Sequence, residues 1–336
     1  MNKVLLLFLC FPFFGYTQIT SIPDANFELA LVNLGYDNFV DGYVLTSNIN
    51  SIDSLIVSGC FIESLVGIAA FQSLSYLDCS SNSLDTLDLS NNYLSFLDCS
   101  GNMLTDIDMS NHLNLQTFKC NHNNFNQIDV SANTSLLYFE CYKNQLSYLD
   151  ISNNEFLTEL RCNDNNLTSL DVAGIDMYVL VCDNNQLSTI DNLGDNVSLK
   201  HFSCSGNNIS SLLLSAHPQL NWLSCSNNNL SQLDISNQSI LNYFFTWGNP
   251  NLNCINVNDI AVANTNWLVW NGQSGNIDAH HYFSTSCLLS SVLDVSSNKE
   301  LISIVNIQGQ KTNVSENVLL LYTYNNGSIE QKIILK

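Results

Sequence analysis

Cysteine is the residue type whose number and spacing most clearly suggest chemistry in this sequence. There are 12 cysteines among 336 residues, and eight of them recur at intervals of 20 to 22 residues. A disulfide framework has irregular spacing, and stacked slots supply a line of sulfurs rather than the tetrahedron that zinc requires. The fixed period therefore predicts no metal site and places each thiol in the same core slot of a repeat. The eight are Cys79, Cys99, Cys120, Cys141, Cys162, Cys182, Cys204 and Cys225.

Aspartate recurs with the same period and offers a second possible chemistry, the binding of cations. Carboxylates stacked about 4.8 Å apart repel one another, so something must offset the repulsion. Calcium between coils is one candidate, because it takes six to eight oxygen ligands. The simpler candidates are nearby backbone amides and serine hydroxyls, which would donate hydrogen bonds to the carboxylates, since the acidic nonapeptide pattern of calcium-binding β-rolls is missing. No cofactor is therefore predicted, with Ca²⁺ as the alternative. The possible cation ladder is Asp88, Asp108, Asp129, Asp150, Asp171 and Asp191.

These residues belong to a repeat of about 21 residues, which sets their positions in space. One unit, from Leu74 to Tyr93, reads LSYLDCSSNSLDTLDLSNNY. It has two alternating segments, Leu-x-Cys and Leu-Asp-Leu, so Leu77 and Cys79 face one side of the backbone and Asp78 the other. The asparagine three residues after each cysteine is predicted to bond backbone groups of the turn. These asparagines are Asn82, Asn102, Asn123, Asn144, Asn165, Asn185, Asn207 and Asn228.

The repeat resembles the short bacterial class of leucine-rich repeats, in which Cys replaces an apolar residue and Leu-Asp-[Leu, Ile, Val] fills the second half. The match covers residues 49–253. An earlier copy has Val57 in the cysteine slot, and a later copy has Thr246. The resemblance implies a leucine-rich-repeat solenoid of about ten coils, with parallel β strands in stacked coils and little helix apart from an N-terminal capping helix. It also implies binding as a class of function.

The N-terminal end of the solenoid is predicted to be closed by a cap, residues 19–48, because an open coil would expose its core. Asp24 is the expected N-cap of a helix that Gly35 ends. The helix would turn its apolar face inward. The apolar residues at helical spacing are Phe27, Ala30, Leu31 and Leu34.

Residues 254–287 are predicted to form the C-terminal cap. Cys254 and Cys287 lie there, outside the periodic series, and are expected to form a disulfide if the protein is exported. Cys60 has no evident mate.

The two ends of the chain predict export. Residues 1–18 resemble a secretory signal peptide, because Lys3 precedes an apolar run that is too short to span a bilayer. Residues 288–336 are predicted to be a small β-rich tail, with turns at residues 308–309 and 326–327.

The tail resembles the C-terminal sorting domain of proteins exported by the type IX secretion system of certain Gram-negative bacteria. The matching segments are residues 304–311, 321–326 and 332–336. The Tyr-Pro-Asn-Pro element of that family is absent, and a small additional β domain is the alternative. The resemblance implies contact with the export machinery and a location outside the cell or on its outer membrane. No transmembrane segment is expected. The protein is expected to be a monomer.

Aromatic residues recur at the outward position before the inward leucine of each cysteine segment. A row of exposed rings suits stacking on sugar rings or gripping an extended peptide. The alternative is that neighbouring rings only stabilise the sheet, although the cluster from Trp222 to Trp247 exceeds what strand propensity requires. The predicted ligand-binding face is Tyr76, Phe96, Tyr138, Tyr142, His201, Trp222, Tyr243, Phe245 and Trp247.

Charge and motif content narrow the function. With 9 basic and 30 acidic residues, the net charge is -21, which disfavours nucleic acid and anionic lipid as partners. No phosphate-binding loop, His-Glu-x-x-His helix or Gly-x-Ser-x-Gly elbow occurs, so an enzyme is not predicted. The sequence favours a non-catalytic, secreted or surface-displayed binding protein for a protein or glycan ligand. The alternative is a structural adhesin or spacer whose contacts are made by its caps.

Overall fold

The computed structural model divides the chain into two compact units, Met1–Cys287 and Leu288–Lys336. It describes residues 18–90, 92–272, 274–287, 301–306, 319–324 and 329–333. The second unit holds an antiparallel sheet of three strands, β16 (Leu301–Asn306), β17 (Leu319–Tyr324) and β18 (Ile329–Ile333). The tail is thus β-rich, as predicted. Most of the predicted signal peptide and the two predicted tail turns lie outside the described residues.

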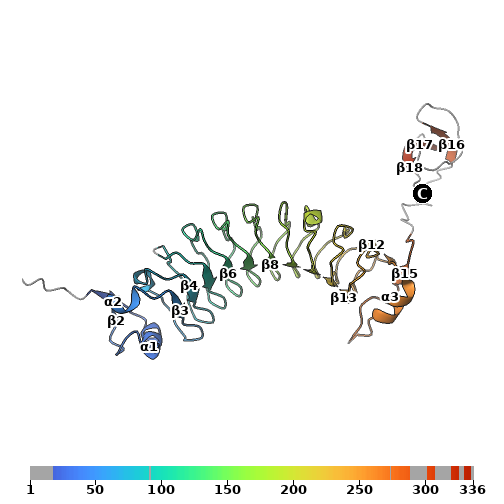
Figure 1. Ribbon diagram of the computed structural model, residues 1–336. Coiled ribbons are helices and arrows are strands. Elements are labelled where there is room, and N and C mark those ends of the chain that lie inside the picture. Colours follow the sequence, from blue (N-terminus) through green and yellow to red (C-terminus); the bar gives the residue numbers. More distant parts are fainter. Residues whose placement is uncertain are drawn as a thin grey trace, which may run out of the picture. The chain divides into compact units, whose positions relative to one another are not determined.

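The first unit is built on a parallel sheet of ten strands, each contributed by one coil. Its strands line the inner side of a curved row of coils (Figure 1). Equivalent residues pair in register, so Leu77 lies beside Leu97 and Tyr76 beside Phe96. The predicted solenoid of parallel strands is therefore confirmed. The strands are β3 (Ser54–Ile56), β4 (Tyr76–Asp78), β5 (Phe96–Asp98), β6 (Thr117–Lys119), β7 (Tyr138–Glu140), β8 (Glu159–Arg161), β9 (Val179–Val181), β10 (His201–Ser203), β11 (Trp222–Ser224) and β13 (Tyr243–Phe245).

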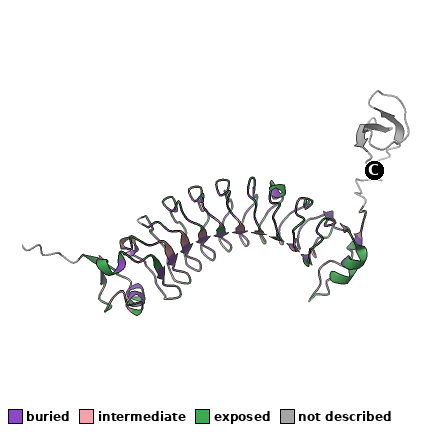
Figure 2. Cartoon of the chain, in the orientation of Figure 1, coloured by how far each residue is buried: buried purple, intermediate pink, exposed green. Residues whose placement is uncertain are grey.

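The core lies inside the coils, where each strand buries its middle residue and turns the two flanking residues outward (Figure 2). The eight periodic cysteines are 0% exposed, which confirms the predicted core slot. Burial raises the pKa of Cys162 and of Cys225 to about 12, so both stay protonated at neutral pH. Such buried thiols fill space as small apolar groups and are chemically inert.

The periodic asparagines bond one coil to the next, as predicted. Asn165 is typical: its Oδ1 accepts the backbone N–H of Leu146 at 3.0 Å, and its Nδ2 donates to the carbonyls of Cys141 and Cys162 at 3.0 and 3.1 Å. Each amide therefore satisfies buried backbone groups of two successive coils. In the first coil Cys60 occupies the position of the asparagine, because there is no preceding coil whose backbone an amide would bond. The N–H of Cys60 donates to Asn82.

A second column of buried polar side chains, which the sequence analysis missed, lies in the other half of the coils. Asn133, for example, donates from Nδ2 to the carbonyls of Met109 and His112 at 3.1 and 2.9 Å. The residue type varies between Asn, His and Gln, so no repeated letter marks the column in the sequence. Its members are Asn92, His112, Asn133, Asn154, Asn196, His217 and Gln238.

The Leu-Asp-Leu segment of the repeat is mostly not a strand, although its alternating pattern is the same as that of the Leu-x-Cys segment. Among the described residues it pairs only at β12 (Leu233–Asp234) and at a bridge between Asp171 and Asp191. Elsewhere the aspartate turns back on its own coil. Asp88, for example, accepts the N–H of Ser90 at 3.0 Å. The backbone thereby makes a local turn instead of a ladder. Short 3-10 helices, Ile68–Ala70 and Leu193–Asp195, occur in other loops.

The N-terminal cap contains β1 (Ile19–Ser21), the predicted helix α1 (Ala25–Asn33), β2 (Tyr43–Leu45) and α2 (Thr46–Ile49). Asp24 is the N-cap of α1 and also accepts the N–H groups of Glu63 and Ser64, which joins the helix to the first coil. Leu34 departs from the predicted apolar face. It is the C-cap residue and is 44% exposed, because the helix ends one residue before it.

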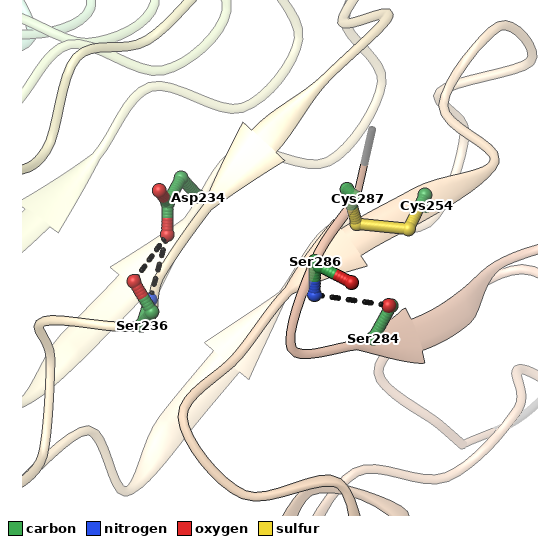
Figure 3. The surroundings of a disulfide bond; sticks show 6 residues. All are labelled: Asp234, Ser236, Cys254, Ser284, Ser286 and Cys287. Carbon is green, nitrogen blue, oxygen red and sulfur yellow. Dashed lines mark hydrogen bonds between the residues drawn. A yellow bond between two sulfur atoms is a disulfide. The ribbon is translucent and has the colours of Figure 1, made fainter. Parts of the chain in front are cut away.

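The C-terminal cap consists of β14 (Cys254–Asn256), α3 (Ile260–Asn266) and β15 (Tyr282–Ser284), with β12 completing a parallel sheet in the order β12-β14-β15. A disulfide joins Cys254 to Cys287 beside this sheet (Figure 3). Trp267 closes the core, with its ring centroid 5.0 Å from that of Phe244 in the last coil.

Candidate binding face

The sheet gathers the predicted aromatic residues on one surface, here called the strand face. It is formed by the outward residues of β3–β11 and β13 and by the residue after the cysteine slot of each coil, which in the last coil is held by Thr246. Six of the nine are the first residues of their strands, Phe245 is the last residue of β13, and Tyr142 and Trp247 follow a strand by two residues. Tyr138 and Tyr243 are 47% and 51% exposed, and the other seven are half-buried. The structure thus brings all nine to the strand face, in separate groups.

The name ring cluster is used here for two neighbouring sets of rings: the linked rings of His201, Trp222, Tyr243 and Phe245, and Trp247 with its partner Trp270, where Trp247 follows Phe245 by two residues. The His201 and Trp222 rings are stacked with centroids 5.0 Å apart, and Trp222 and Tyr243 with centroids 4.6 Å apart. Trp247 stacks on Trp270 at 5.0 Å. Trp270 was not predicted as a member, because it comes from the C-terminal cap rather than from a repeat. Burial is the main cause that lowers the pKa of His201, so its ring is neutral at pH 7.

Other rings lie apart from the ring cluster. Tyr76 and Phe96 stack with centroids 4.0 Å apart. Tyr142 meets the ring of His122 edge to face, at 5.2 Å. Tyr138 pairs in register with Thr117 and Glu159, so it has no aromatic neighbour along the sheet.

Apart from Asp183, which follows Cys182, the charged side chains of the strand face lie in one part of it. Strands β4–β8 each carry at least one charged residue, whereas β9, β10, β11 and β13 carry none. In β6–β8, Lys119 faces Glu140 at 3.9 Å, and Arg161 pairs with Glu159. Residues 201–287 hold three acidic and no basic residues, against 23 acidic and four basic in residues 18–200. The ring cluster therefore occupies the weakly charged end of a strongly acidic unit.

The aspartates of the predicted cation ladder are exposed and hydrogen-bonded within their own coils. The backbone and hydroxyl of Ser90 lower the pKa of Asp88, and the hydroxyl and backbone of Ser110 do the same for Asp108. Asp129 and Asp150 have equivalent partners in Ser131 and Ser152. Asp171 accepts from Ala173, and Asp191 from the hydroxyl of Thr189. These donors offset the repulsion between neighbours, and calcium binding stays a prediction.

A cavity of about 470 Å³ lies between the segment after β3 and the second halves of the next two coils. Asp85, Asp88, Asp106 and Asp108 contribute its carboxylates, and Leu87 and Ile107 part of its apolar lining. None of the nine predicted binding residues lines it.

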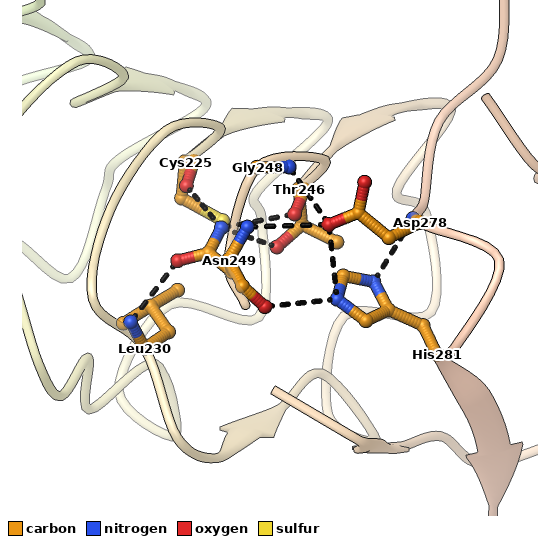
Figure 4. Close-up of polar contacts among 7 residues, drawn as sticks. All are labelled: Cys225, Leu230, Thr246, Gly248, Asn249, Asp278 and His281. Atoms are coloured by element: carbon orange, nitrogen blue, oxygen red, sulfur yellow. Dashed lines mark hydrogen bonds and ion pairs between the residues drawn. The ribbon is translucent and has the colours of Figure 1, made fainter. Parts of the chain in front are cut away.

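Asp278 and His281 fasten the C-terminal cap to the last coil (Figure 4). Asp278 Oδ2 accepts the N–H groups of Gly248 and Asn249, at 2.8 and 3.2 Å. His281 Nδ1 accepts the N–H of Asp278 at 3.2 Å, and its Nε2 lies 3.3 Å from the Asn249 carbonyl. Although His280 is near enough to complete a possible metal-binding trio, both nitrogens of His281 are engaged in this network. The cluster is therefore structural.

Comparisons with known proteins place the fold. No protein-family model and no curated protein matches the chain. Among solved structures, it is similar to the functional domain of InlJ from Listeria monocytogenes, described as including a cysteine ladder. The two share 25% identity with a TM-score of 0.55 over 71% of this chain and 66% of that one, just under two thirds of the Listeria domain.

Two further similar structures are the APL1 leucine-rich-repeat domain and the LRIM1/APL1C complex. The APL1 domain gives 20% identity and a TM-score of 0.55 over 64% of each chain. The complex gives 20% and 0.53, over 64% of this chain and 45% of that one. No described helix is both long and apolar enough to cross a membrane. Together with the ten in-register parallel strands, these likenesses identify the fold as a leucine-rich-repeat solenoid.

Proposed function

We propose that this chain is a non-catalytic binding protein that presents the strand face to a protein or glycan ligand. The observation that carries the proposal is the ring cluster, a group of half-buried aromatic side chains with the exposed Tyr243, at the weakly charged end of an acidic unit. Tryptophan and tyrosine supply large rigid contact areas and dominate the energetics of many interfaces. One neighbouring structure, LRIM1/APL1C, is that of a complex, which supports a protein as the ligand.

Sheet stabilisation alone does not account for the ring cluster. Cross-strand pairing explains the contacts of Trp222 with His201 and Tyr243, because these residues are paired in register. It does not explain Trp270, which belongs to no strand and stacks on Trp247 from the cap. A tryptophan that joins these rings from outside the repeats supports a surface that contacts a ligand.

The buried thiols and two buried histidines support a role without catalysis. The eight periodic thiols are buried, and burial raises the pKa of Cys99, for example, well above its ordinary value. His112 and His217 are buried and hydrogen-bonded to backbone groups of preceding coils. Catalytic groups need access to substrate, which these side chains lack.

We further propose that the protein works outside the cell, secreted or held at the outer-membrane surface of a Gram-negative bacterium. The apolar N-terminal segment and the sorting-domain-like tail support export. The disulfide between Cys254 and Cys287 supports an oxidising compartment. Deleting residues 288–336 tests the route: the shortened protein should stay in the periplasm, and its normal appearance outside the cell would count against the proposed role of the tail.

The binding role is tested with the double substitution Trp222→Ala and Trp247→Ala. Wild type and variant are compared on an array of glycans and surface proteins, with circular dichroism spectra as a check on folding. We expect the ligands of the wild type to be lost in a variant that remains folded. Unchanged binding by the folded variant would remove the ring cluster from the proposal.

A structural adhesin or spacer, with contacts made by the caps, is the second candidate. The exposure of Phe39 and Phe61 in and beside the N-terminal cap favours it, since they are 73% and 80% exposed. Replacing both with serine should leave array binding unchanged if the strand face carries function. Loss of cell adhesion in this variant, with adhesion unaffected by the tryptophan substitutions, would favour the spacer.

A further inference from the structure

We infer that the ring cluster binds a polypeptide through the edges of its rings rather than a sugar on their faces. This inference rests on the proposed function of the strand face and narrows its ligand to one class. It follows from how the sheet orients the aromatic side chains.

The parallel register forces neighbouring rings to stack. His201, Trp222 and Tyr243 are directly paired on adjacent strands β10, β11 and β13. Neighbouring strands lie about 4.8 Å apart, which is close to the spacing of stacked rings. The interplanar angles are 6° for His201 with Trp222 and 30° for Trp222 with Tyr243. One backbone spacing therefore sets both the distance and the near-parallel orientation.

Stacking covers the faces of the rings and leaves their edges for contact. Trp222 has a ring on either side, so both faces of its indole are covered. Tyr76 and Phe96 stack in a similar way, at 4.0 Å and 5°, and each covers one face of the other. Because Trp222 is still only half-buried, its accessible part is the rim that points away from the sheet. A ligand that approaches the centre of the ring cluster meets ring edges.

Ring edges and ring faces recognise different chemistry. The face of an aromatic ring is negative and attracts cations and polarised C–H groups, whereas the edge is positive and attracts oxygen. The rims of Trp222, His201 and Tyr243 also carry N–H and O–H groups. A polypeptide offers a carbonyl oxygen at every residue, together with apolar side chains that can lie between the rims. A sugar ring that needs an open aromatic face finds none at Trp222.

The surroundings of the ring cluster fit an uncharged stretch of polypeptide. The outward residues of β9–β11 and β13 are valine, serine, histidine or aromatic. The nearest acidic group on this part of the strand face, Asp183, accepts hydrogen bonds from Ser203 and Ser205. Burial raises the pKa of Asp183, the opposite of what a partner cation would cause. A peptide with apolar side chains thus meets no uncompensated charge.

Tyr138 provides a matched control on the same face. It occupies the same strand position as Trp222, is 47% exposed, and has Thr117 and Glu159 beside it instead of rings. No ring stacks on it. A ligand that stacks on aromatic faces should therefore depend more on Tyr138 than on Trp222, and a ligand that contacts edges should depend more on Trp222.

The test uses the purified full chain with two probes, a random-peptide phage library and an array of immobilised glycans. We expect the library to yield peptides whose affinity falls at least about tenfold in Trp222→Ala and less than about twofold in Tyr138→Ala. Saturable binding to the glycan array is not expected. If Trp222→Ala fails to fold by circular dichroism, Tyr243→Ser at the end of the stack replaces it, with the same expected loss.

The failures are distinguishable. Glycan binding that is lost in Trp222→Ala or Tyr138→Ala would overturn the polypeptide inference while leaving the strand face as a binding surface. Peptides that bind wild type, Trp222→Ala and Tyr243→Ser equally would overturn the inference and also the proposed role of the ring cluster. A library that yields no peptide above background would likewise count against a polypeptide ligand.

Discussion

The two ends of the strand face share an interior and differ on the outside. Both the charged strands β4–β8 and the uncharged strands β9–β11 and β13 bury a leucine or phenylalanine in the middle. The same asparagine ladder runs beneath all of them. Because the same core is built under both surfaces, the change from charged residues to rings is not required for folding. The difference therefore locates the part of the surface that is free to serve recognition.

A large effect should be the same at both ends, because it acts on the shared interior. Asn165 lies under the charged strands and Asn207 under the uncharged ones, each 7% exposed. Replacing either with leucine leaves one buried N–H without its acceptor and removes one of the two amide donors from each of two carbonyls, which keep only the neighbouring asparagine. We expect the free energy of unfolding to fall by about 3 kcal/mol or more in each variant, measured by urea denaturation. A large loss for only one of them would mean that the two interiors are not equivalent.

Replacing cysteines should change the free energy of unfolding differently at the two ends. Cys254 and Cys287 are 33 residues apart, and loop entropy predicts a loss of about 4 kcal/mol when both are replaced by serine. Cys60, at the other end and unpaired, is the matched control. Its replacement by serine should change the free energy of unfolding by less than about 0.5 kcal/mol. Equal effects of the two changes would contradict the role given to the disulfide.

A pH dependence should also be concentrated at the C-terminal end. Burial, the largest cause, lowers the pKa of His281 below its ordinary value, although the Asn249 carbonyl and Asp278 raise it. The unfolded chain therefore takes up a proton at His281 before the folded chain does. Stability should be complete above about pH 6.5 and decline as the pH falls below that value, until the folded pKa is passed.

His281→Gln measures this contribution. Thermal melts between pH 7.5 and 5 should show a smaller decline for the variant than for wild type. An identical decline would assign the effect to other histidines, such as His112 and His201, whose pKa values burial also lowers.

The repeating parts of the molecule could be predicted from the sequence, and the parts that have no repeated residue type could not. Cys79 and Asn82 recur as letters, and each letter corresponds to one physical slot, so core and ladder could be predicted. The column that contains His112 and Asn133 was not predicted, because three residue types form the same hydrogen bonds to the backbone of the preceding coils. The contact of Trp270 with Trp247 was not predicted, because Trp270 lies outside the repeats and the fold of the cap brings the two rings together. The stacking that covers Trp222 required the register of the strands.

The smallest expected effect concerns calcium, whose candidate ladder lies mainly in the coils of the charged strands. Asp88 and Asp108 already accept donors from Ser90 and Ser110, which lower their pKa values without a metal. We therefore expect the melting temperature to be the same in EDTA and in millimolar calcium. An increase with calcium that disappears in Asp108→Asn would show that the ladder binds the ion.

The most direct test of the binding face follows the indole N–H signals of the four tryptophans by NMR during titration with a library-selected peptide. Trp222, Trp247 and Trp270 belong to the ring cluster, whereas Trp267 is 8% exposed in the core of the cap and serves as an internal reference. The account predicts saturable shifts of the Trp222 and Trp247 signals and little change at Trp267. Saturation with no shift at Trp222 or Trp247 would contradict it.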